Sequence, residues 1–132
     1  MKSIIKISNK DVECVCNAAT PILYTEIFKE DFLTNMMSFA RYQGKKPEDF
    51  TPDDLAFVSR RSVMFTKVAF IFAKQAEFGD DVEKLESLTR SDFLKWLSTF
   101  DESNAFTSGE VLSGILQLWL GNSTTLTESK ND

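Results

Sequence analysis

The side chains that could do acid–base chemistry in this chain are carboxylates and lysines, because it contains no histidine. Adjacent acids occur at Glu30-Asp31, Asp53-Asp54 and Asp80-Asp81. Neighbouring residues on a helix point about 100° apart, so the two carboxylates of a doublet do not converge on one substrate atom. Helix N-termini and solvated loops also explain each doublet. An enzyme that uses a carboxylate pair is therefore the weakest functional hypothesis, and no catalytic residue is predicted.

Other reactive groups lack the neighbours that their chemistry needs. Ser62 and Lys67 could lie on one helix, but no oxyanion loop accompanies them. Cys14 and Cys16 are the only cysteines; two thiols are too few for a metal site, and a disulfide between them would strain the backbone. We expect both to be small buried residues in a reducing compartment. The acidic segment 79–86 lacks the ligand spacing of a calcium loop, so neither metal nor cofactor is predicted.

The composition favours a folded acidic domain. The chain has 132 residues, of which 42% are hydrophobic, and its formal net charge is −5. This balance argues against a nucleic acid or an anionic membrane surface as the main partner. The longest apolar run, residues 68–73, is much shorter than the roughly 20 residues of a membrane span. The N-terminus lacks the apolar block of a signal peptide, so we expect cytoplasmic residence.

The first elements that could position a site are two short strands. Residues 3–7 and 12–16 alternate in polarity and are joined by the polar cluster 8–11. Ile5 and Ile7 could share a face with Val12, Cys14 and Cys16. Because an isolated hairpin is marginally stable in water, we expect this one to pack on the rest of the chain.

Helix start and stop signals divide the rest of the chain, after the hairpin, into predicted helices. Thr20-Pro21 predicts one helix, and residues 31–42 predict a second that ends at Gly44. A capping box at residues 51–54 opens a segment without proline or glycine until Gly79, which predicts one helix of about 27 residues, roughly 40 Å long. A break near residues 60–62 is the alternative. Two further boxes, at residues 89–92 and 107–110, open the last helices, and Gly121 is expected to end the final one.

These signals predict a mainly α fold, with four to five helices around one long central helix and a small N-terminal β-hairpin at about residues 3–16. Residues 1–121 form a single helical domain in this interpretation. Residues 122–132 are polar without periodicity, which predicts a flexible tail.

The central helix is apolar around more than half of its circumference, which is more than a helix on the rim of a small domain needs. We expect one side, with Phe65, Val68 and Phe72, to lie in the core. The remaining methionine and aromatic side chains are typical of adaptable grooves that accept apolar helices. The candidate partner-binding residues are Leu33, Met36, Met37, Phe57, Met64 and Ile71.

The order of elements resembles the tail assembly chaperones of long-tailed (siphovirus-type) phages and prophages of Gram-positive bacteria. Residues 18–33 are similar to the family's small residues followed by Leu-Tyr and Phe-Gly-x-Asp, with Lys29-Glu30 where glycine is common. Residues 62–77 resemble its helix ending in Ala-Lys-Gln-Ala, and residues 91–97 resemble its Phe-Leu-x-x-Leu helix. A short hairpin before these segments, and a final helix and polar tail after them, complete the pattern.

The resemblance implies a non-enzymatic protein of the host cytoplasm that is absent from the mature virion. Members of the family bind and solubilise the tape measure protein and promote assembly of the tail tube protein around it. Self-association is common among them, and some make a longer frameshifted product. The alternative from another class is a small acidic regulatory adaptor or inhibitor that binds a host protein.

Overall fold

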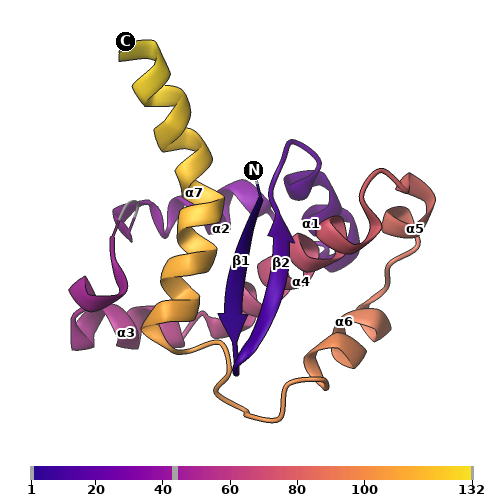
Figure 1. Cartoon of the computed structure of the whole chain (residues 1–132), viewed down its shortest axis with the longest axis horizontal. Coiled ribbons are helices and arrows are strands. Elements are labelled where there is room, and N and C mark those ends of the chain that lie inside the picture. The colour runs from indigo at the N-terminus through magenta and orange to yellow at the C-terminus, as the bar shows by residue number, and fades with distance from the viewer. Residues whose placement is uncertain (1, 43–44, 132) are drawn as a thin grey trace.

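The computed structural model describes residues 2–42 and 45–131; at positions 36, 47 and 121–131 it describes the backbone alone. Figure 1 shows a two-stranded hairpin among helices. The elements, in chain order, are β1 (Lys2–Ile7), β2 (Lys10–Val15), α1 (Thr20–Phe28), α2 (Phe32–Met37), η1 (Ala40–Tyr42), η2 (Pro47–Asp49), α3 (Pro52–Ser59), α4 (Ser62–Phe78), α5 (Val82–Glu86), α6 (Arg90–Leu97) and α7 (Gly109–Asn131). The predicted mainly α fold with a small N-terminal hairpin is confirmed.

The hairpin closes through a two-residue turn, two residues shorter than predicted. Ser8 and Asn9 both adopt positive φ angles, 48° and 65°, which fit the right-handed twist of paired strands. The register places Ile5 opposite Val12. Ile5, Ile7 and the two cysteines are buried, so the predicted inner face is confirmed. This face packs on α4 through β2 and on α7 through β1.

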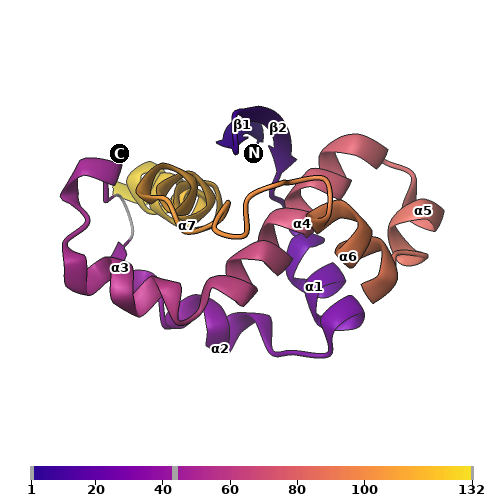
Figure 2. The ribbon, with the colours of Figure 1, turned by 90° about the horizontal axis from the view of Figure 1, so that it is seen from below.

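Helix α4 lies at the centre of the molecule and contacts β2, α1, α5, α6 and α7 (Figure 2). Phe65, Val68 and Phe72 are completely buried, as predicted. Gly79 ends the helix with a positive φ of 56°. Gly114 of α7 lies against β1, where an added Cβ would come within 3.3 Å of Ile5. The small residue therefore allows the close approach of α7 to the hairpin.

The prediction of one unbroken helix from residue 52 to 78 is wrong. Ser59 ends α3 and Ser62 begins α4, at the position of the alternative break. Phe57 packs edge-on against Phe39, and Val58 is completely buried. These contacts hold α3 against the chain segment that precedes it, and the break gives α3 its own direction (Figure 2). The chain thus has more helical segments than the four to five expected.

Two of the predicted capping boxes are present, at Thr51 and Thr89. The third is wrong, because the Ser108 hydroxyl, rather than Thr107, accepts the Val111 N–H and caps α7. Thr20 also does not cap α1: its buried hydroxyl donates to Gln75 Oε1 at 2.5 Å.

Two predicted helix ends differ from the structure. The helix expected over residues 31–42 is divided into α2 and η1. The end expected at Gly121 is wrong, since α7 continues to Asn131 and extends past the other elements in Figure 1. One glycine costs a helix about 1 kcal/mol relative to alanine, which is too little by itself to end a long helix.

Candidate functional site

The acidic doublets act as helix caps and ion-pair partners. Asp54 closes the Thr51 box and lies 2.6 Å from Lys45 Nζ. The hydrogen bonds from Lys45 and from the Thr51 N–H lower the pKa of the Asp54 carboxyl. Asp31 accepts the N–H of Leu33 at 3.0 Å at the start of α2. The sequence therefore predicted correctly that these acids have structural explanations at helix starts.

The most enclosed charged group is Lys67, which is 8% exposed and forms an ion pair with Glu30. Tyr24 donates to the other oxygen of Glu30 at 2.8 Å, and the Asn35 amide donates to the Tyr24 hydroxyl at 3.3 Å. Burial raises the pKa of Glu30, but the hydrogen bonds from Lys67 and Tyr24 outweigh it, so the net pKa is lowered. The Lys67 ammonium is thus paired with Glu30 and not with Ser62.

The side chains of Cys14 and Cys16 are both buried. Burial raises the pKa of Cys14 to about 12, so its reactive thiolate form is suppressed at neutral pH. Within residues 2–42 and 45–131, no group of three or more potential metal ligands gathers. The two cysteines therefore act as small buried residues on the inner face of the hairpin.

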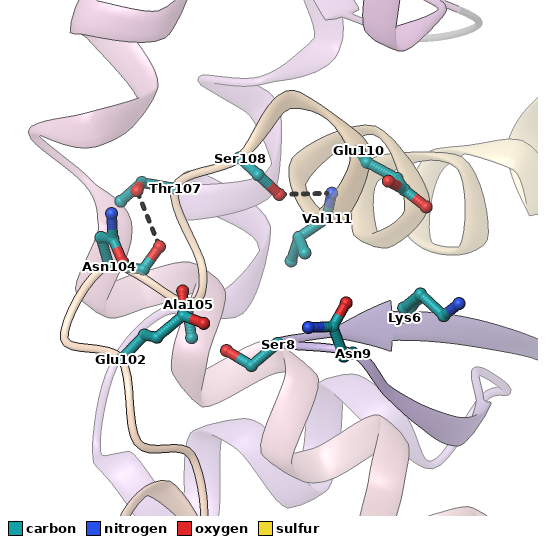
Figure 3. A pocket seen from close by; sticks show the side chains of 10 residues that line it. All are labelled: Lys6, Ser8, Asn9, Glu102, Asn104, Ala105, Thr107, Ser108, Glu110 and Val111. Atoms are coloured by element: carbon teal, nitrogen blue, oxygen red, sulfur yellow. Dashed lines mark hydrogen bonds between the residues drawn. The ribbon is translucent and has the colours of Figure 1, made fainter.

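A polar hollow of about 490 Å³ lies between the hairpin turn and the loop before α7 (Figure 3). Its charged groups are Lys6, Glu102 and Glu110. The Thr107 hydroxyl donates to the Asn104 carbonyl at 2.9 Å, and the Ser108 hydroxyl caps α7, so both are used within the loop. Lys6, Glu102 and Glu110 are all exposed, so the charges of this hollow are solvated.

The feature that suits binding is an exposed apolar surface around α2, which we call the α2 face. Its residues are Ile22 of α1, Leu33 and Met37 of α2, and Val63 of α4, each 60–74% exposed. The other large exposed apolar side chains of the described residues, Ile4, Val82 and Leu94, lie singly on other elements. Clustering of exposed apolar side chains on one face is typical of an interaction site.

Two hollows flank α2 and make this face concave. Ile22 and Leu33 line a groove of about 370 Å³ between α1 and α2. Val63 and Met64 line a second hollow of about 520 Å³ between α2 and the start of α4, together with polar residues that include Glu30, Asp31, Arg61 and Lys67. Figure 2 shows α2 at the edge of the molecule opposite the hairpin. The α2 face is therefore accessible and shaped to receive protruding side chains.

Two arginines are stacked on one phenyl ring beside this face. The guanidinium carbons of Arg41 and Arg61 lie 4.1 and 3.9 Å from the centroid of the Phe57 ring. Such cation–π contacts orient a guanidinium without neutralising it. In the described part of the chain, no carboxylate lies within 4.0 Å of either arginine. Both charges are exposed and remain available to a partner.

The structure separates the predicted partner-binding residues into three groups. Leu33 and Met37 are exposed on the α2 face, and Phe57 and Met64 are half-buried beside it. The side chain of Met36 lies outside the part that the structure describes. The expectation that Ile71 lies on an exposed side is wrong, because it is completely buried. Helix α4 is covered on several sides, so its apolar residues from Phe65 to Ala73 are all buried.

The sequence interpretation missed Ile22, Val63, Arg41 and Arg61. Leu23 and Tyr24 are both buried, and successive residues of a helix point about 100° apart. Helical spacing could therefore have placed Ile22, which directly precedes them, outside the core. The arginine pair depends on tertiary contacts between segments 20 residues apart, for which the sequence carries no signal.

In the described residues, no helix combines the length and apolarity needed to cross a membrane. Comparisons with family models, curated proteins and solved structures give no match to this chain.

Proposed function

We propose that this protein is a phage tail assembly chaperone that binds and solubilises the tape measure protein while tail tube protein assembles around it. The observation that supports this most is the α2 face, where Ile22, Leu33, Met37 and Val63 leave an apolar surface open between two hollows. The order of hairpin, helices and polar C-terminal segment, which resembles the tail assembly chaperones, supports it as well.

An amphipathic helix fits the chemistry of this surface. Its apolar side chains repeat at three- and four-residue spacings and insert into a groove lined by flexible apolar residues. Removing apolar surface from water contributes about 25 cal/mol per Å² before the entropy of association is subtracted. A stable interface covers roughly 800 Å² on each partner, so the α2 face would form its centre and neighbouring surface its rim.

The acidic character of the chain suits a chaperone that must stay in solution while it displays apolar side chains. The net charge of −5 keeps copies apart in general, since like-charged surfaces repel. Among the described residues, the buried Lys67 is paired with Glu30, and burial raises the pKa of the Cys14 thiol to about 12. Binding, rather than chemistry, accounts best for the exposed groups.

Co-expression with a long helical protein encoded directly downstream tests the proposal. We expect that protein to stay in the supernatant and to elute with this chain. The Met37→Asp variant should lose the complex, because it places a charge at the most exposed apolar side chain of the α2 face. The matched control is Leu94→Asp, at an exposed apolar position on α6, which should keep it. If the downstream protein is insoluble with the wild-type chain and no complex elutes, the proposal is wrong.

A further inference from the structure

Arg41, Phe57 and Arg61 form a basic site beside the α2 face, which we call the arginine stack. The two guanidinium carbons lie 4.1 and 3.9 Å from the centroid of the Phe57 ring, so they are at most about 8 Å apart. The ring is held edge-on against Phe39, and Arg61 also donates to the Phe57 carbonyl at 3.2 Å. Both guanidinium groups are therefore oriented before a partner arrives, which reduces the entropy lost on binding.

The positive charge of the arginine stack is not balanced within the described part of the chain. The charged groups that act on the neighbouring Tyr42 hydroxyl are Asp54, Arg41, Lys45 and Arg61, and Asp54 forms an ion pair with Lys45. Among the described residues, neither arginine has a carboxylate within 4.0 Å. The chain as a whole has 20 acidic and 15 basic residues, so acids are in excess and still leave this site unpaired. The counter-charge is left for a partner to supply.

The hollow between α2 and the start of α4 is neutral in sum. Its charged lining residues are two acids and two bases: Glu30, Asp31, Arg61 and Lys67. Lys67 is already paired with Glu30, and Asp31 accepts the Leu33 N–H at the start of α2. Arg41 does not line this hollow, so the excess of positive charge lies at the arginine stack itself. An acidic group of a partner is therefore favoured at the stack rather than inside the hollow.

We propose that the segment bound by the α2 face is an amphipathic helix with two carboxylates one turn apart along the border of its apolar stripe, and that the arginine stack binds these carboxylates. This inference rests on the proposed function, because it specifies the partner segment of the same face. A guanidinium group donates two parallel hydrogen bonds to a carboxylate, which a lysine ammonium does not match.

The spacing of the arginine stack suits such a helix. Residues four apart on a helix have Cβ atoms about 5–6 Å apart, so two flexible glutamate side chains can each reach one of the guanidinium groups. Arg61 lines the same hollow as Val63 and Met64, so the site is continuous with the apolar residues of the face. One helix can therefore place its apolar stripe on the α2 face and its acidic border on the stack.

Two synthetic peptides test the inference without the downstream protein. Both form amphipathic helices with the same leucine stripe; one carries glutamate, and the other lysine, at two positions one turn apart beside the stripe. The chain's net charge of −5 favours the lysine peptide in general, so a preference for glutamate requires a local basic site. We expect the glutamate peptide to bind at least about tenfold more tightly by fluorescence anisotropy.

Charge reversal on the chain identifies the site. The double variant Arg41→Glu/Arg61→Glu should prefer the lysine peptide, because the two guanidinium groups are replaced by carboxylates. Arg61→Glu alone should reduce the preference for the glutamate peptide. Its matched control is Arg60→Glu, which makes the same charge change at the adjacent exposed residue, outside the Phe57 stack, and should keep that preference. Circular dichroism establishes that each variant is folded, and the comparison on the wild-type chain needs no variant.

The inference is overturned if the wild-type chain binds neither peptide, binds both equally or prefers lysine, or if the double variant still prefers glutamate. Co-expression separates this failure from that of the chaperone proposal. A complex with the downstream protein that survives Arg41→Glu/Arg61→Glu would retain the chaperone proposal and remove the carboxylate site. A glutamate preference that the double variant reverses, together with an insoluble downstream protein, would retain the carboxylate site and reject the tape measure protein as its partner.

Discussion

The structure assigns Ile71 to the core and Val63 to the surface, although both lie on α4 and both are β-branched. Ile71 is completely buried, and Val63 is 60% exposed. Ile71→Ala should therefore lower the free energy of unfolding by about 2–5 kcal/mol, through lost burial and the cavity that remains. Val63→Ala removes a mostly solvated side chain and replaces it with a better helix former, so its effect should stay within about 0.5 kcal/mol.

Urea unfolding followed by tryptophan fluorescence measures this difference. Trp119 is buried in the core, so its emission should change on unfolding. For a slope of about 2 kcal/mol per molar urea, a loss of 3 kcal/mol lowers the midpoint by about 1.5 M. All variants should be compared at one protein concentration and in one buffer. Equal midpoints for the two variants, or a larger loss for Val63→Ala, would refute the division of α4 into core and surface.

Four further outcomes follow from individual contacts. Gln75→Leu should cost about 1–3 kcal/mol by urea unfolding, because the buried Thr20 hydroxyl loses its acceptor. Because the pKa of Glu30 is lower in the folded than in the unfolded chain, its carboxylate stabilises the fold above the unfolded-state pKa of about 4.3. This stabilisation is lost as the pH falls through the folded-state pKa. Glu30→Gln should therefore make the free energy of unfolding less dependent on pH in the acid range. Because Cys14 is buried and its pKa is raised, its thiol should react with iodoacetamide far more slowly in the native protein than in urea. Mass spectrometry measures the extent of alkylation. Gly114→Val should lower the melting temperature, because its side chain would press on Ile5. The control Ala56→Val, at an exposed helical position, should change the melting temperature much less.

Local signals in the sequence were reliable where the interaction is itself local. The boxes at Thr51 and Thr89 satisfy N–H groups three residues away, so their residue types reveal them directly. The alternation of Ile5 and Ile7 likewise identified the buried face of the hairpin. The break between α3 and α4 carries neither glycine nor proline. It arises from packing of Phe57 against a distant segment, which composition does not encode.

The residues of the candidate site also divide into those that local sequence signals identify and those that depend on tertiary packing. Leu33 and Met37 could be identified from the sequence because they repeat at a four-residue spacing on one short helix. Ile71 was misassigned, because a helix that is apolar all round can be covered either by its own chain or by a partner. The structure resolves that ambiguity for α4, whose neighbours surround it. It also reveals the Arg41–Phe57–Arg61 stack, which supplies the charge pattern that apolar periodicity cannot show.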